Sequence, residues 1–126
     1  MILLDTSVLI DLFRTKDKSK TFFYKLSTDY SDFAISSITH YEILLGSNSL
    51  QDKFWDTFFN SLTIIPFDVS CSFEAVKIYK SLKSKNNLID IADITIAATA
   101  FAKKIKLATL NIKHFERINN LELIYK

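Results

Sequence analysis

Glycine, proline and cysteine are almost missing from this chain: each occurs once, as Gly46, Pro66 and Cys71. A single glycine excludes the glycine-rich loop with which many nucleotide-binding proteins hold phosphates. A single cysteine excludes a disulfide framework, and with two separated histidines it argues against a zinc site. We therefore expect a protein of a reducing compartment, the cytoplasm. Without any glycine- or proline-rich linker, residues 1–126 are expected to form one domain.

A strong charge of one sign and a long apolar run are missing as well. The 16 Lys and Arg residues nearly balance the 14 Asp and Glu residues, so passive coating of nucleic acid is not indicated. No apolar stretch approaches the roughly 20 residues that span a bilayer, and Asp5 interrupts the apolar opening. Neither a membrane segment nor a signal peptide is expected. What the chain does have is 48% hydrophobic residues, enough for one packed core.

Short apolar strands alternate with amphipathic helices along the chain. The expected strands are Ile2–Leu4, Phe33–Ser36, Thr63–Phe67, Lys106–Leu110 and Glu122–Tyr125. The expected helices are Thr6–Phe13, Lys18–Ser27, Thr39–Leu45 with Gly46 as its stop, Gln51–Leu62, Phe73–Lys83 and Ala92–Lys103. The last of these is apolar almost all round and is expected to be a buried central helix. The alternation predicts an α/β fold whose parallel sheet is covered on both faces.

Acidic residues recur where strands end and helices begin. Asp5 follows the first strand, Glu42 lies early in a helix, and Asp90 and Asp93 stand three residues apart at the start of another. Mg²⁺ takes one or two carboxylates directly and fills its shell with water and substrate phosphate. If the fold brings these acids together, the pattern favours a metal-dependent phosphodiester enzyme.

Each acid also has a purely structural explanation. Asp5 is placed to cap the following helix, and the segment from Thr39 to Glu42 fits a capping box. Asp90 or Asp93 could have the purely structural role of a negative charge that interacts favourably with the positive end of the helix dipole. These alternatives stay open here, because only the fold decides whether the acids converge. The remaining acids Asp11 and Asp68 are expected to be solvated.

Four segments resemble the motifs of PIN-domain nucleases, in particular the VapC-type toxins of bacterial toxin–antitoxin pairs. They are Leu3–Asp11, Ser37–Gly46, Asp93–Ala100 and Ala108–Phe115, and together they cover nearly the whole chain. The resemblance implies a three-layer α/β/α sandwich with a mainly parallel central sheet. It also implies an endoribonuclease, dependent on Mg²⁺ or Mn²⁺, that hydrolyses RNA phosphodiester bonds through a metal-activated water.

The resemblance assigns roles to individual residues. It implies that Asp5 and Asp93 bind the metal ion and that Glu42 completes the catalytic acids. Auxiliary positions around these three acids are Thr6, Ser7, Asp90, Thr109 and Asn111. The hydroxyls among them are expected to orient carboxylates or water.

The fourth motif departs from the common pattern of the family. Asn111 stands where many relatives carry Asp, and His114 stands where an acid is often found. An amide offers an oxygen but no negative charge, so a second metal ion is not expected before substrate binds. His114 either contacts substrate phosphate or has no role, and the sequence leaves the choice open.

Three partners follow from the resemblance: an RNA substrate, a cognate antitoxin and a second copy of the chain in a homodimer. The aromatic clusters Phe22–Tyr24 and Phe54–Phe59 are expected mainly in the core, with a surplus for an antitoxin helix or the dimer face. Candidate contacts to the RNA backbone are Lys16, Lys18, Lys20, Lys103, Lys104 and Lys113. Two alternatives remain: a catalytically silent PIN-like RNA- or protein-binding module, and a PIN nuclease of RNA processing without an antitoxin.

Overall fold

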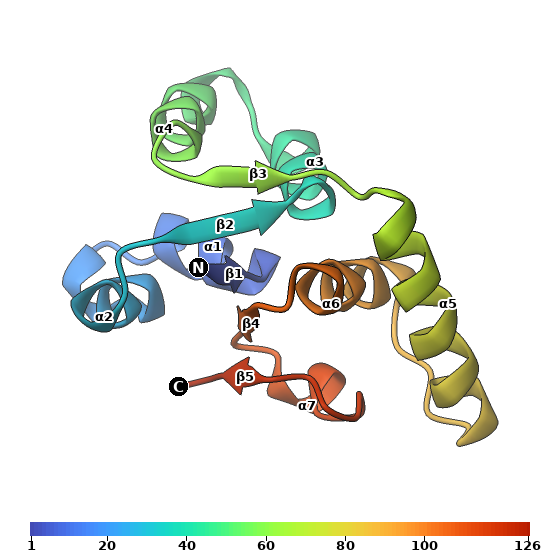
Figure 1. The fold of residues 1–126 in the computed structure, drawn as a ribbon. Coiled ribbons are helices and arrows are strands. Elements are labelled where there is room, and N and C mark those ends of the chain that lie inside the picture. The colour runs from blue at the N-terminus through green and yellow to red at the C-terminus, as the bar shows by residue number, and fades with distance from the viewer.

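The computed structural model describes every residue from Met1 to Lys126 (Figure 1). Its strands are β1 (Ile2–Leu4), β2 (Phe33–Ser36), β3 (Thr63–Ile65), β4 (Lys106–Ala108) and β5 (Leu123–Ile124). Its helices are α1 (Thr6–Arg14), α2 (Phe22–Asp29), α3 (Ser37–Gly46), α4 (Ser49–Phe59), α5 (Val69–Ser84), α6 (Ile91–Lys103) and α7 (Ile112–Phe115), with a 3₁₀ turn η1 (Lys18–Lys20) ahead of α2.

The five strands form one sheet in the order β3-β2-β1-β4-β5, and every neighbouring pair is parallel. Leu3 in the middle of β1 pairs with Ala34 on one side and Leu107 on the other. Because the strands are parallel, their carboxyl ends meet at one edge of the sheet. The connections run in opposite directions from β1, so the point where the strand order reverses lies between β1 and β4. The predicted parallel α/β fold is confirmed.

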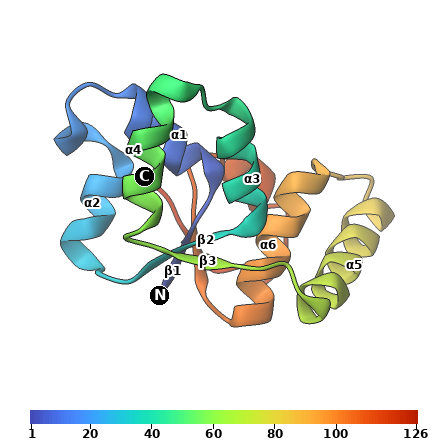
Figure 2. The same ribbon diagram turned by 90° about the horizontal axis from the view of Figure 1, so that it is seen from above.

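Successive side chains of the strands point to opposite faces of the sheet and belong to two separate hydrophobic cores. Leu3 and Leu107 pack with α5, α6 and Phe115 of α7, whereas Leu4 and Ile35 pack with α1, α2 and α4. In both views α1, α2 and α4 gather on one side of the molecule, away from α5 and α6 (Figures 1 and 2). Helices therefore cover both faces, which gives the three layers α/β/α.

Helix α6 is the buried helix that the sequence predicts. Its consecutive residues Ile96–Ala100 are all buried in the core below β1 and β4. Lys104 ends the helix in the left-handed conformation, at φ 56°. No helix in the structure combines the length and the apolar character needed to cross a membrane.

Several element boundaries differ from those predicted. The expected helix Lys18–Ser27 is split, because the Thr21 hydroxyl accepts a hydrogen bond from Tyr24 N–H and starts α2 afresh. Gly46 closes α3 as a helical residue without a positive φ, so it does not act as a left-handed stop. The single turn of α7 was not predicted, since four residues carry no helical period.

Candidate active site

Asp5 leaves β1 at the carboxyl edge of the sheet with only 3% of its surface exposed. It occupies the N-cap position of α1, yet its carboxylate makes no capping hydrogen bond. Oδ2 accepts instead from the hydroxyls of Ser7, at 2.7 Å, and Thr109, at 2.9 Å. The capping explanation of Asp5 is therefore wrong.

The two hydroxyls that hold Asp5 are themselves fixed. Ser7 Oγ accepts a hydrogen bond from Leu110 N–H, and Thr109 Oγ1 accepts one from Asn111 N–H. With an N–H group on each hydroxyl oxygen, the single hydroxyl proton is directed at the carboxylate. Thr109 follows β4, so this network crosses the reversal point between β1 and β4.

Glu42 lies in the middle of α3 rather than at its start. The true N-cap is Ser36, whose hydroxyl accepts from Thr39 N–H at 3.1 Å, so the expected capping box does not exist. Glu42 Oε1 instead accepts a hydrogen bond from the Thr6 hydroxyl at 2.7 Å. Thr6 and Thr39 hydroxyls are 2.9 Å apart, and because the Thr6 proton serves the carboxylate, Thr39 must donate to Thr6.

Asp93 lies in the first turn of α6, half-buried beside His114. Burial raises the pKa of its carboxyl; a hydrogen bond with His114 opposes that shift, and the negative charges of Asp5 and Asp90 add to it. His114 Nδ1 lies 2.8 Å from Asp93 Oδ2. Asp5, which follows β1, is close enough for its charge to act on Asp93 at the start of α6, so the fold brings these two distant segments near each other.

Each of the three acids keeps one carboxylate oxygen without a partner in the protein. The hydrogen bonds fall on Oδ2 of Asp5, Oε1 of Glu42 and Oδ2 of Asp93. No buried side-chain oxygen in the structure lacks a hydrogen-bond partner, so the three remaining oxygens are open to solvent. One free oxygen each on Asp5 and Asp93 fits a hard divalent cation, which accepts one or two carboxylates.

The acids of the site do not converge into a ready-made set of three metal ligands. No group of three or more His, Cys, Asp or Glu side chains lies close enough to hold a metal ion together. Glu42 is held by Thr6, the residue that follows Asp5 at the start of α1. Asp90 is exposed at the N-cap of α6 without a capping bond and acts on Asp93 only by its charge.

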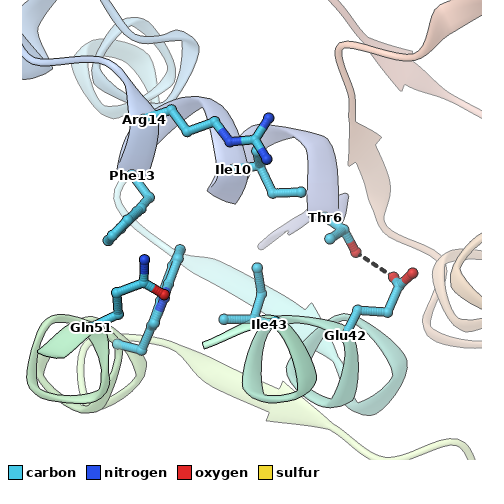
Figure 3. A pocket seen from close by; sticks show the side chains of 9 residues that line it. Thr6, Ile10, Phe13, Arg14, Glu42, Ile43 and Gln51 are labelled. Atoms are coloured by element: carbon cyan, nitrogen blue, oxygen red, sulfur yellow. Dashed lines mark hydrogen bonds between the residues drawn. The ribbon is translucent and has the colours of Figure 1, made fainter. Parts of the chain in front are cut away.

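A pocket of about 410 Å³ opens beside Glu42. Thr6 and Glu42 face each other at one end of it, while Phe13 and Arg14 line it from α1 and Gln51 lines it from α4 (Figure 3). Sequence reasoning did not single out Arg14 or Gln51, because neither stands at a strand end. Only the packing of α1, α3 and α4 in the fold shows that these two residues line one pocket.

The aromatic clusters behave as predicted for core residues. Trp55 is only 4% exposed and stacks on Phe13 at 5.4 Å between ring centroids. Phe22 is buried, whereas Phe54 and Phe58 are half-buried. Tyr24 is half-exposed, and Phe13 and Ile10 line the pocket beside Glu42.

Two acids expected to be solvated have structural partners. Asp11 accepts from Phe22 N–H, and Asp68 caps α5 by accepting from Cys71 N–H. Asp68 also pairs with Lys103 at 2.8 Å. That hydrogen bond is the main reason why the pKa of Asp68 is far below its ordinary value.

Two of the six lysines proposed as RNA contacts are likewise engaged within the chain. Lys103 is held by Asp68, and Lys18 donates to the carbonyls of Leu12, Phe13 and Thr15. Lys18 thereby satisfies carbonyl oxygens at the C-terminal end of α1. We do not assign either lysine to nucleic acid.

Fold and site together define a class: a parallel α/β/α sandwich with acids from β1, α3 and α6 at the carboxyl edge of its sheet. The sequence pattern of the PIN domain matches residues 2–121. Ribonuclease VapC1 of Methanocaldococcus jannaschii is 37% identical over 123 residues, covering 97% of this chain and 84% of that protein. The chain therefore belongs to the PIN-domain family, among the VapC proteins.

Two further comparisons agree with this assignment. Ribonuclease VapC of Rickettsia bellii is 29% identical, covering 98% of this chain and 94% of that protein. The crystal structure of VapBC2 from Rickettsia felis, bound to a DNA fragment from their promoter, superposes with a TM-score of 0.88 at 31% identity. The match covers 100% of this chain and 99% of that chain. The fold predicted from the resemblance is thus confirmed over its whole length.

Proposed function

We propose that this protein is a metal-dependent endoribonuclease toxin whose activity a cognate antitoxin blocks. The observation that carries the proposal is the open carboxylate oxygen on each of Asp5, Glu42 and Asp93, at one edge of a PIN-domain sheet. Support comes from relatives named as VapC ribonucleases and from the likeness to a VapBC complex. We take residues 1–126 as one functional unit that works in the cytoplasm.

Asp5 and Asp93 would hold the cation, Mg²⁺ or Mn²⁺, through their free oxygens. This role suits both acids, because a divalent charge favours the ionised carboxylate of Asp93, whose pKa is raised first by burial and then by the charges of Asp5 and Asp90. When bound, the cation lowers the pKa of a coordinated water and neutralises charge on the phosphate. Ser7 and Thr109 keep Asp5 in one orientation by donating both hydroxyl protons to Oδ2.

Glu42 is positioned to handle the proton of the attacking water. Thr6 fixes Oε1, which leaves Oε2 free to accept a hydrogen bond or a proton. Because water rather than the RNA 2′-hydroxyl is the nucleophile, the products should carry 5′-phosphate and 3′-hydroxyl ends. Cyclic 2′,3′-phosphate ends would contradict this route.

The pocket beside Glu42 offers the antitoxin a binding site. Its apolar wall of Ile10, Phe13 and Trp55 suits an apolar segment, and its far end reaches Glu42. An occupant there would block Glu42 while burying apolar surface.

The homodimer also stays a prediction. Helix α5 carries an exposed apolar stripe of Val69, Phe73 and Val76, and we expect a second copy of the chain to cover it. Sedimentation of Phe73→Glu against the wild type tests this prediction.

The decisive experiment incubates purified, antitoxin-free protein with total RNA in Mg²⁺, Mn²⁺ or EDTA and maps the ends of the products. Asp93→Asn purified in parallel controls for contaminating ribonuclease. Discrete cuts that need the cation and disappear in the variant support the proposal. Equal cutting by both proteins would count against the assigned site.

A catalytically silent RNA- or protein-binding module is the second candidate, and two observations favour it. No three metal-binding side chains converge, and Asn111 supplies no charge to the fourth motif. Metal-loaded protein that binds RNA without cutting it would establish this alternative. A processing nuclease without an antitoxin would instead cut, but lack a neighbouring antitoxin gene.

A further inference from the structure

His114 contacts the proposed metal ligand Asp93, yet the proposed chemistry gives it no role. Its neighbour Phe115 is fully buried in the core against α6, so the single turn of α7 is anchored there. The imidazole is 37% exposed, while the Asp93 side chain that it meets is 16% exposed. The anchored turn thus holds the partly exposed ring against the half-buried carboxylate of Asp93.

Two groups compete for the same ring atom. Asp93 Oδ2 and the side-chain amide nitrogen of Asn111 each lie 2.8 Å from His114 Nδ1. One ring nitrogen either donates through its proton or accepts through its lone pair, and cannot do both. An ionised carboxylate only accepts, and its bond is stronger than one between neutral groups. Nδ1 therefore carries the proton and donates it to Asp93.

We propose that His114 is a positioning residue: its Nδ1–H holds Oδ2 of Asp93 so that the other oxygen faces the divalent cation. With the proton on Nδ1, the Asn111 amide fits beside the ring with its oxygen rather than its nitrogen toward Nδ1, an orientation reached by a simple flip of the side-chain amide. Asp5 is held in the same way by Ser7 and Thr109. Each acid of the pair thus has one oxygen fixed by the protein and one left open. The inference rests on the proposed role of Asp93 in cation binding.

The test uses two substitutions that differ by one methylene group. In His114→Asn the amide nitrogen replaces Nδ1, whereas in His114→Gln it replaces Nε2. Mn²⁺ is titrated calorimetrically into the folded wild type, both variants and His114→Ala. We expect Ala to weaken Mn²⁺ binding by about 10- to 100-fold, the usual effect of losing an outer partner of a metal ligand. Asn should restore most of the affinity, and Gln should not.

The matched control is the other histidine of the chain. His40 packs on the ring of Phe59, and His40→Asn should leave Mn²⁺ binding unchanged. Unchanged binding in His114→Ala, or rescue by Gln but not by Asn, would overturn the inference. Because the readout is cation binding, a wild type that binds Mn²⁺ without cutting RNA refutes the proposed function and leaves this inference standing. A wild type that binds no Mn²⁺ overturns both.

Discussion

The Thr6 hydroxyl donates a hydrogen bond of 2.7 Å to Oε1 of Glu42, joining the first turn of α1 to the middle of α3. Behind it, the fully buried Thr39 keeps Thr6 in place. A surface glutamate would be free to rotate, whereas this one has a fixed oxygen and a free one. The orientation of Glu42 therefore depends on residues from two helices.

Substitution of Glu42 should lower the cleavage rate more than substitution of its hydrogen-bond donor Thr6. Glu42→Gln should lower the rate by about 10²- to 10⁴-fold, the range for loss of a general base. Thr6→Val should cost about 10-fold, as for an outer residue that only orients a catalytic group. Initial rates on a defined RNA measure both. Thr28→Val, whose hydroxyl bonds only to Lys25 O within α2, is the control. Equal losses in Thr6→Val and Thr28→Val would refute the positioning role of Thr6.

Asp93→Asn should make the metal-free protein more stable while it abolishes cleavage. Burial raises the folded-state pKa of Asp93, so ionising this group costs stability as pH rises through that value. In EDTA at pH 7 we expect the variant to melt a few degrees higher than the wild type. The difference should vanish in acid below the ordinary carboxyl value of 3.8. Thermal melts across pH check this, and a variant that melts lower at pH 7 would contradict it.

Asp68 should show the opposite pH dependence. Its pKa is lowered, chiefly by Lys103, so its contribution to stability is present above the ordinary value of 3.8 and is lost as pH falls. Asp68→Asn should melt slightly lower at pH 7, because an exposed ion pair adds little stability and Asn can still cap α5, and the difference should shrink in acid. Lys103→Met should reproduce part of this loss, and the double variant should lose less than the sum, because the two residues share one ion pair. Additive losses would show that the ion pair is not formed.

Gly46 offers a way to fill the pocket without disturbing the fold. A Cβ there meets no atom within 4 Å, and its φ is not positive. Gly46→Ala should therefore stabilise the protein by about 0.4–1 kcal/mol. Gly46→Leu should project into the pocket and weaken antitoxin binding, because Gly46 lines it.

Trp55 reports on the same pocket. Its ring lines the cavity and stacks on Phe13, so its fluorescence should change when antitoxin binds. An unchanged spectrum in a complex proven by size-exclusion chromatography would place the antitoxin elsewhere. Normal binding by Gly46→Leu would lead to the same conclusion.

Local sequence patterns were sufficient for most of the fold. Alternating strands and helices predict the parallel sheet, and the continuous apolar surface of α6 predicts its burial, because both depend on side-chain periodicity within one segment. The split before α2 and the single turn of α7 were missed. Both depend on one or two hydrogen bonds rather than on a repeated pattern.

The sequence identified Asp5, Glu42 and Asp93 as candidate site residues. It did not exclude the alternative that each acid only stabilises the start of a helix. Only the fold showed that Ser36 caps α3, that Asp5 accepts from Thr109, and that His114 reaches Asp93. The physical reason is distance along the chain. A capping bond joins neighbours and can be read locally, whereas a site joins side chains from different segments. Which atoms meet there is decided by the packing of α1, α3, α6 and α7 around the sheet.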